Sequence, residues 1–265
     1  MSTQFLYPHG PLGPDASPQD LSGNVADVPR LGIYTQETVQ RFIPATRYIT
    51  WDGRVFKYAK SGAALYTGEA AFFGDEEKVT YSSVATAQNA GDTQVTIATQ
   101  SFAKDILAGG YVIIFGADNS DVQNRGIIGN NYCSSATLII DLDGPLASAL
   151  TTSLAVEVCG NPYMNILYAG SPNRSVAGLP AVKVSAASKF FWLQTWGICW
   201  VAPGVAITGN TQRQFVFAST DGSGSIKPHT AALATTVQNQ HAGFLVNAGT
   251  GSDSGAPFIM LQISI

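Results

Sequence analysis

The sequence predicts a mainly β protein with two small β-barrel or β-sandwich regions, preceded by an extended N-terminal arm. Short apolar or alternating segments recur about every ten residues between Gly, Pro, Asn and Asp residues, a pattern typical of strands joined by turns. Asp52-Gly53 separates two alternating runs and favours a tight hairpin. Five prolines lie between residues 8 and 29 in a segment with little apolar periodicity, which favours extended backbone.

The most aromatic stretch is Phe190–Val201, which reads FFWLQTWGICWV. Trp192, Trp196 and Trp200 are four residues apart, a spacing that fits one face of a helix or of a strand. Aromatic and β-branched residues suit a strand, and Gly197 weakens a helix interior. We therefore expect one central strand, or two strands bent at Gly197, with the three tryptophans mostly buried in the core or at a subunit contact.

The chain divides into an arm (1–50), a first β domain (51–160), a connection (161–180) and a C-terminal β domain (181–265). The hairpin of residues 48–60 opens the first domain. The final segment, Phe258–Ile265, is apolar to its last residue, so we expect a paired strand there rather than a fraying end. Further strands are expected at residues 79–84, 93–99, 111–115, 136–142, 154–158, 182–184, 205–208, 214–218 and 243–246.

The arm carries large apolar side chains among its prolines. A segment that served only as a tether would be rich in Gly and Ser and would lack such side chains. Separated anchors on a chain stiffened by proline are expected to lie on a neighbouring subunit or on a larger assembly. The alternative is a disordered or proteolysed tail. The expected anchors of the arm are Phe5, Tyr7, Tyr34 and Phe42, and the C-terminal strand adds Phe258.

Composition limits the partners of the chain. Only 12% of its residues are charged, against about 25% in an average soluble domain, so we expect burial of much of its surface in a homo-oligomer. Net charge is −4 without a basic cluster, which argues against nucleic-acid binding. No apolar run approaches the roughly 20 residues of a membrane span, and the N-terminus lacks the pattern of a signal peptide. Cys133, Cys159 and Cys199 have no metal-binding spacing, and free thiols fit synthesis in a cytosol.

No segment specifies an enzyme or a cofactor. Ser252–Pro257 is similar to the surroundings of a trypsin-like nucleophile, but none of the three histidines lies in the context that a catalytic triad requires. Asp141 and Asp143 alternate on one expected strand without a partner that would indicate acid–base chemistry. Asp118 and Asp121 share a loop that could hold a calcium ion, but the loop lacks the regular EF-hand spacing, so we expect solvated turn residues there.

Several short segments occur in a recognisable order along the chain. They are Asp52–Lys60 followed by Gly62-Ala63, then Ala90–Thr93, Gly109–Tyr111, Leu142–Leu146, Asn161–Tyr163 and, most specifically, Phe191–Gly197. Together they resemble a group of tailed-bacteriophage virion proteins. The resemblance extends from about Trp51 to the C-terminus, and its C-terminal part is similar to small β decoration (cement) proteins.

The resemblance implies a non-enzymatic protein on the virion capsid surface, made in the bacterial host cytoplasm. Such a protein binds the major capsid protein as a homotrimer and stabilises the joints between capsid subunits. The alternative is a tail-fibre or spike β module that recognises the host surface.

Overall fold

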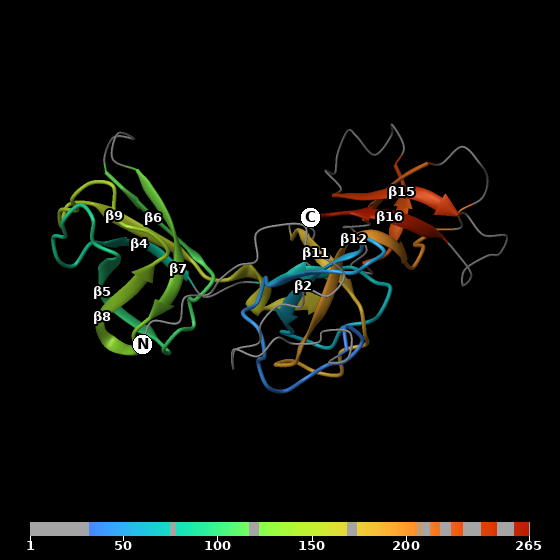
Figure 1. The fold of residues 1–265 in the computed structure, drawn as a ribbon, viewed down its shortest axis with the longest axis horizontal. Coiled ribbons are helices and arrows are strands. Elements are labelled where there is room, and N and C mark those ends of the chain that lie inside the picture. Colours follow the sequence, from blue (N-terminus) through green and yellow to red (C-terminus); the bar gives the residue numbers. More distant parts are fainter. Residues whose placement is uncertain are drawn as a thin grey trace. The chain divides into compact units, whose positions relative to one another are not determined.

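The computed structural model confirms a mainly β protein. The described residues form strands and one 3-10 turn, Pro162–Met164, and they include no α-helix. The chain folds into two compact units, one built from the chain up to Gly74 and from Asn165 onward, the other from Asp75–Met164. Each unit contains one curled sheet (Figure 1). The structure describes residues 32–74, 78–116, 122–168, 174–205, 207, 213–217, 224–229, 240–247 and 257–264.

The second unit is an antiparallel six-stranded sheet that nearly closes into a barrel. Its strand order is β4-β9-β6-β7-β8-β5. Val84, just after β4, bridges Ile97 of β5, and the Ala85 N–H donates to the Thr96 carbonyl at 2.8 Å. These contacts bring the two ends of the sheet together. The strands are β4 (Lys78–Ser83), β5 (Gln94–Phe102), β6 (Tyr111–Phe115), β7 (Gln123–Asn130), β8 (Cys133–Leu142) and β9 (Ala155–Cys159).

Alternation along these strands fills the inside of the curled sheet. Successive side chains of a strand point to opposite faces. The inward positions carry Val, Ile and Leu, and the exposed positions of β5 and β8 are mostly polar. The closed curvature gives the unit one continuous core of its own. Its fully buried side chains include Val95, Ile97, Leu107, Val112, Ile114, Leu138, Ile140 and Val156.

The first unit contains a ten-stranded sheet in which strands from both ends of the chain are paired. Eight strands follow the order β10-β3-β11-β12-β16-β15-β13-β14, while β2 pairs with β12 and with β1. The strands are β1 (Arg47–Ile49), β2 (Val55–Lys60), β3 (Ala71–Phe73), β10 (Ile166–Tyr168), β11 (Val176–Pro180), β12 (Phe190–Trp200), β13 (Gln214–Phe217), β14 (Ile226–Pro228), β15 (His241–Asn247) and β16 (Phe258–Gln262).

Strand β12 is the aromatic segment, and it runs as one strand through the middle of this sheet. Its first part pairs with β2 and its second part with β16. The register with β2 shifts between Gln194 and Trp196. Gly197 adopts a φ of +98°, and a Cβ there would lie 2.9 Å from the Arg54 Cα, so the position requires glycine. The irregularity at Gly197 therefore redirects β12 from one set of neighbours to another without ending the strand.

The described part of the predicted arm, residues 32–50, folds onto its own unit. Glu37 exchanges two backbone hydrogen bonds of 2.8 Å with Phe190 at the start of β12. Phe42 is 3% exposed, and its ring lies 5.1 Å from Tyr58 and 5.4 Å from Trp192. The expectation that Phe42 anchors the chain on a neighbouring molecule is corrected, because this ring completes the core of its own unit. Phe5 and Tyr7 lie outside the described residues.

The boundaries of the units also differ from the predicted domains. Residues 51–74 belong with the C-terminal half of the chain because β2 and β3 pair with β12 and β11. The expected connection, 161–180, contributes β10 and β11 to the same sheet. The second unit is thus an insertion in the first, and the Gly74 N–H donates to the Asn165 carbonyl at 2.7 Å where the chain leaves and returns.

A substitution at Phe42 measures how much residues 32–50 stabilise the first unit. We expect Phe42→Ala to lower the free energy of unfolding of this unit by roughly 3–5 kcal/mol, the range for a buried phenylalanine. The matched control is Val39→Ala, because Val39 lies in the same segment but is 69% exposed. This substitution should change the free energy of unfolding by less than about 0.5 kcal/mol. Urea unfolding followed by tryptophan fluorescence reports this unit alone, since all four tryptophans lie in it. Equal midpoints for the two variants would contradict the packing of Phe42.

Candidate functional site

One side of the sheet formed by β12, β16 and β15 presents apolar side chains to solvent. Ile198, Met260 and Phe244 lie directly opposite one another on the three strands, and Trp200 lies opposite Phe258. Directly paired residues of an antiparallel sheet project from the same face. The apolar face is defined here as Trp196, Ile198, Trp200, Phe244, Phe258 and Met260.

The opposite side of these strands packs on the core of the unit. Ile259 and Leu261 of β16 are fully buried there, and Cys199 and Leu245 pack against them. Antiparallel sheets of this kind usually alternate between apolar residues on the core side and polar residues on the solvent side. Here the solvent side is apolar as well, with Ile198 53%, Phe244 44% and Phe258 43% exposed. Exposed apolar patches of this kind mark interaction surfaces.

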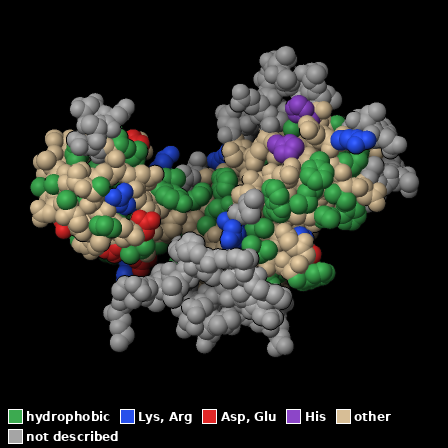
Figure 2. Space-filling model, turned by 45° about the horizontal axis from the view of Figure 1, so that its top comes forward, with side chains coloured by type: hydrophobic (Ala, Val, Ile, Leu, Met, Phe, Trp, Pro, Cys, Tyr) green, Lys and Arg blue, Asp and Glu red, His purple; other side chains and the backbone are tan. Residues whose placement is uncertain are grey.

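The apolar face carries no ionisable side chain. Trp196 pairs with Gln262 at its polar end, where the Gln262 Oε1 atom lies 3.2 Å from the His241 Nε2 atom. Figure 2 shows hydrophobic side chains gathered below the two described histidines (purple), with few charged groups among them. A partner for this surface would therefore have to be apolar, because a charged group buried against it would lose its hydration without compensation.

The three tryptophans of β12 occupy different surroundings. Trp192 is buried among aromatic rings, with Tyr58 at 5.1 Å and Tyr48 at 6.0 Å. Trp196 and Trp200 are partly exposed. The Trp200 ring covers Gly68, where a Cβ would lie 2.2 Å from a ring carbon, and its Nε1 atom is buried without a hydrogen-bond partner among the described residues.

The remaining predicted anchors are distributed across the first unit. Phe258 joins Trp196 and Trp200 on the apolar face, so the structure brings together three of the residues singled out in the sequence. Tyr34 is exposed elsewhere, and its hydroxyl accepts a hydrogen bond from Arg54 Nη1 at 3.0 Å. Burial raises the pKa of Tyr58 to about 12, so this hydroxyl stays neutral in the aromatic core around Trp192.

Trp51, at the tip of the β1–β2 hairpin, was not singled out from the sequence. It is 88% exposed, although the turn beneath it is well ordered by hydrogen bonds. The Thr50 N–H donates to the Arg54 carbonyl at 2.9 Å, and Arg54 Nε pairs with Asp52 Oδ2 at 2.8 Å. Partial burial favours the neutral form of Asp52, but hydrogen bonds from Thr50 and Arg54, together with the Arg54 charge, outweigh this effect and lower its pKa. The sequence predicted the Asp52-Gly53 turn next to Trp51. The alternating pattern did not predict that the Trp51 side chain packs on neither strand.

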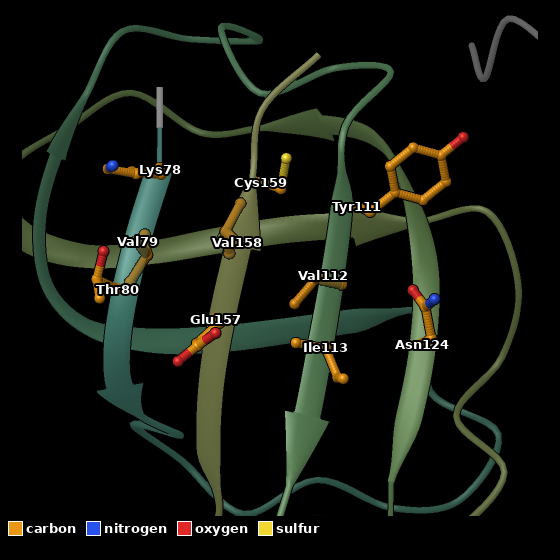
Figure 3. A pocket seen from close by; sticks show the side chains of 10 residues that line it. All are labelled: Lys78, Val79, Thr80, Tyr111, Val112, Ile113, Asn124, Glu157, Val158 and Cys159. Atoms are coloured by element: carbon orange, nitrogen blue, oxygen red, sulfur yellow. The ribbon is translucent and has the colours of Figure 1, made fainter. Parts of the chain in front are cut away.

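The second unit has a shallow hollow of about 260 Å³ on the outside of its curled sheet. Lys78, Cys159 and Tyr111 lie in one row across β4, β9 and β6, and the small cysteine leaves space between its longer neighbours (Figure 3). A second row contains Glu157, Ile113 and Asn124. The hollow thus combines an exposed aromatic ring with a carboxylate, an amide and an ammonium group.

Within the part of the chain that the structure describes, His, Cys, Asp and Glu form no group of three or more that could hold a metal ion. The two carboxylates that alternate in the sequence, Asp141 and Asp143, have structural partners: Asp141 accepts from Gln94 Nε2 at 2.7 Å, and Asp143 accepts from the Gly126 N–H at 2.9 Å. Burial raises the pKa of the Cys199 thiol to about 12. Asp118, Asp121 and residues 252–256 lie outside the described ranges.

No helix among the described residues has the length and apolar character needed to cross a membrane. The chain matches no family model, no curated protein and no solved structure in comparisons with each. The apolar face and the hollow are therefore identified from the structure of the two units alone.

The contact between Trp200 and Gly68 can be tested with a pair of glycine variants. Gly68 and Gly53 have nearly the same φ, +79° and +82°, but only Gly53 has open space where a Cβ would be placed. Gly53→Ala should cost roughly 1–2 kcal/mol of stability from backbone strain alone. Gly68→Ala carries the same strain and must also displace the Trp200 ring, so we expect a larger loss in urea unfolding and a shifted tryptophan emission in the folded state. Identical losses and spectra would show that Trp200 does not rest on Gly68.

Proposed function

We propose that this chain is a non-enzymatic structural protein of a tailed-bacteriophage virion, a decoration (cement) protein that binds the outer face of the capsid shell. The observation that carries the proposal is the apolar face of the first unit. Its exposed side chains recover about 25 cal/mol for each Å² that leaves water. A protein that works as an isolated monomer gains nothing from such a surface, whereas an assembly protein buries it.

The partner follows from the sequence resemblance, which implies the major capsid protein and a homotrimeric decoration protein. Low charge supports the same proposal, since 12% charged residues leave wide neutral surfaces for contact with other subunits. The function is mechanical. A protein that binds only the assembled shell stabilises that shell by mass action and holds capsid subunits together at their joints.

Co-sedimentation with shells that lack this chain tests the proposal. Wild-type protein should pellet with the shells, and Ile198→Asp should reduce its occupancy at least tenfold because a charge replaces an apolar contact. Ile128→Asp is the matched control, because Ile128 of β7 is also a strand isoleucine and is 54% exposed, against 53% for Ile198. Failure of the wild-type chain to bind shells would reject the function, and equal loss in both variants would reject the apolar face as the assembly surface.

A host-recognition module of a tail fibre or spike is the second candidate, favoured by the hollow on the second unit. Carbohydrates bind to exposed aromatic rings flanked by hydrogen-bonding groups, and Tyr111 with Glu157, Asn124 and Lys78 offers that combination. If the chain has this function, it should bind host-surface polysaccharide, and Tyr111→Ala should abolish the binding. Tyr132→Ala is the control, since Tyr132 is also exposed and lies in the same unit. Antibody labelling of virions separates the two candidates, by label over the head or at the tail tip.

A further inference from the structure

We propose that Trp51 of one copy docks on the apolar face of a second copy of this chain. The inference rests on the proposed function only in assigning the contact to the decoration oligomer. It names the occupant of the apolar face and the residue that fills it. Because Trp51 is 88% exposed, it does not pack against the apolar face of its own chain, and the contact has to be made between molecules.

The backbone turn from which the Trp51 side chain projects is held in one conformation by hydrogen bonds. Asp52 accepts from Arg54 Nε at 2.8 Å and also bonds to the Thr50 hydroxyl, while Gly53 takes the left-handed conformation that the tight turn needs. These bonds order the turn before any partner arrives. Preorganisation lowers the entropy cost of association, and tryptophans held in this manner are among the residues that contribute most to interface affinity.

The charges on the two surfaces are compatible. The apolar face has no ionisable residue, and the charged residues next to Trp51 neutralise each other through the Asp52–Arg54 ion pair. Docking therefore places no unpaired charge against an apolar surface, which would be costly. The hydroxyl of Tyr34 is likewise satisfied by Arg54 beside the same turn.

Trp51 supplies a substantial part of the area that a stable contact requires. A standard interface buries about 800 Å² on each partner, and a fully exposed aromatic side chain contributes roughly 150–250 Å². Trp51 offers most of one such aromatic area, and Ile49 of the same hairpin is also exposed. On the other surface, Ile198, Phe244 and Phe258 are each about half exposed, with Met260 and the two tryptophans between them.

The donor turn and the receiving face are different parts of one unit, so copies can join head to tail in a heterologous contact. Heterologous contacts generate closed rings when the rotation closes, and a ring of three agrees with the homotrimer implied by the sequence resemblance. Each copy would then give one tryptophan and receive one. A copy that lacks either surface can still make one contact but cannot complete the ring.

Mixing two variants tests this arrangement without shells. Trp51→Ala keeps the receiving face, and Ile198→Asp keeps the tryptophan; each alone should be monomeric at micromolar concentration in sedimentation velocity, with self-association weakened at least tenfold. Mixed at equal concentrations, they should form a one-to-one heterodimer and nothing larger. Phe244→Ser provides a second variant of the face should Ile198→Asp fail to fold, as judged by circular dichroism and tryptophan emission. Tyr132→Ala and Ile128→Asp are the controls and should retain the wild-type oligomer.

Several results would overturn the proposal. A monomeric wild-type chain would overturn it. The proposed function would not be affected by that result, because binding to shells is tested separately by co-sedimentation. A wild-type oligomer for Trp51→Ala, with loss only for Ile198→Asp, would assign the apolar face to another occupant, such as the same face of a second copy or residues 1–31. A mixture in which the variants remain separate monomers would exclude the heterologous contact.

Discussion

The pairing of β12 with β2 along its first part and with β16 along its second part is the constraint on which the first unit depends. Because of this pairing, one strand contributes to two groups of buried residues: the aromatic rings around Trp192, and the aliphatic and phenylalanine side chains around Leu261. The change of partners occurs at Gly197, where the approach of Arg54 leaves no space for a side chain. Both ends of the described chain in this unit are held by β12, since Glu37 bonds to Phe190 and Ile263 donates to Thr195 at 3.0 Å.

The apolar face is a direct consequence of this arrangement. Once Ile259 and Leu261 point into the core, the residues between and beside them on β16 must point outward, and those residues are Phe258, Met260 and Gln262. Only the last of these is polar. The residues paired with them on β12 and β15 are also apolar. The surface can therefore bind apolar partners, and its side chains are not needed to fill the core. An assembly protein gains stability from such a face, whereas an isolated monomer carries it as a liability for aggregation.

The outer surface of the second unit differs in character from the apolar face of the first. The curled sheet of the second unit buries one face almost completely and closes on itself through Val84 and Ile97, so its core is formed by the inward residues. The hollow beside Tyr111 arises because Cys159 is small, and its lining combines charged, amide and aromatic groups. The two units thus offer chemically distinct surfaces, an apolar one suited to subunit contacts and a mixed one suited to a polar ligand.

Local chemistry in the sequence determined the mainly β character and the Asp52-Gly53 turn, because alternation and turn residues act over a few positions. It left open whether the aromatic segment forms one strand or two strands bent at Gly197, and the structure shows one strand. Pairing between distant segments was decided only in the tertiary structure. Nothing near residues 51–74 specifies that they join β11 and β12 across a ninety-residue insertion (75–164), since the same pattern of alternation fits any partner strand. For the same reason the sequence predicted Phe42 as an anchor on a neighbouring molecule, although it is a core residue of its own unit. The four-residue spacing marked Trp192, Trp196 and Trp200 as equivalent, but the register shift beside Gly197 gave them separate surroundings. Exposure depends on which neighbours cover a side chain, and for Trp51 and the apolar face that was settled by the fold alone.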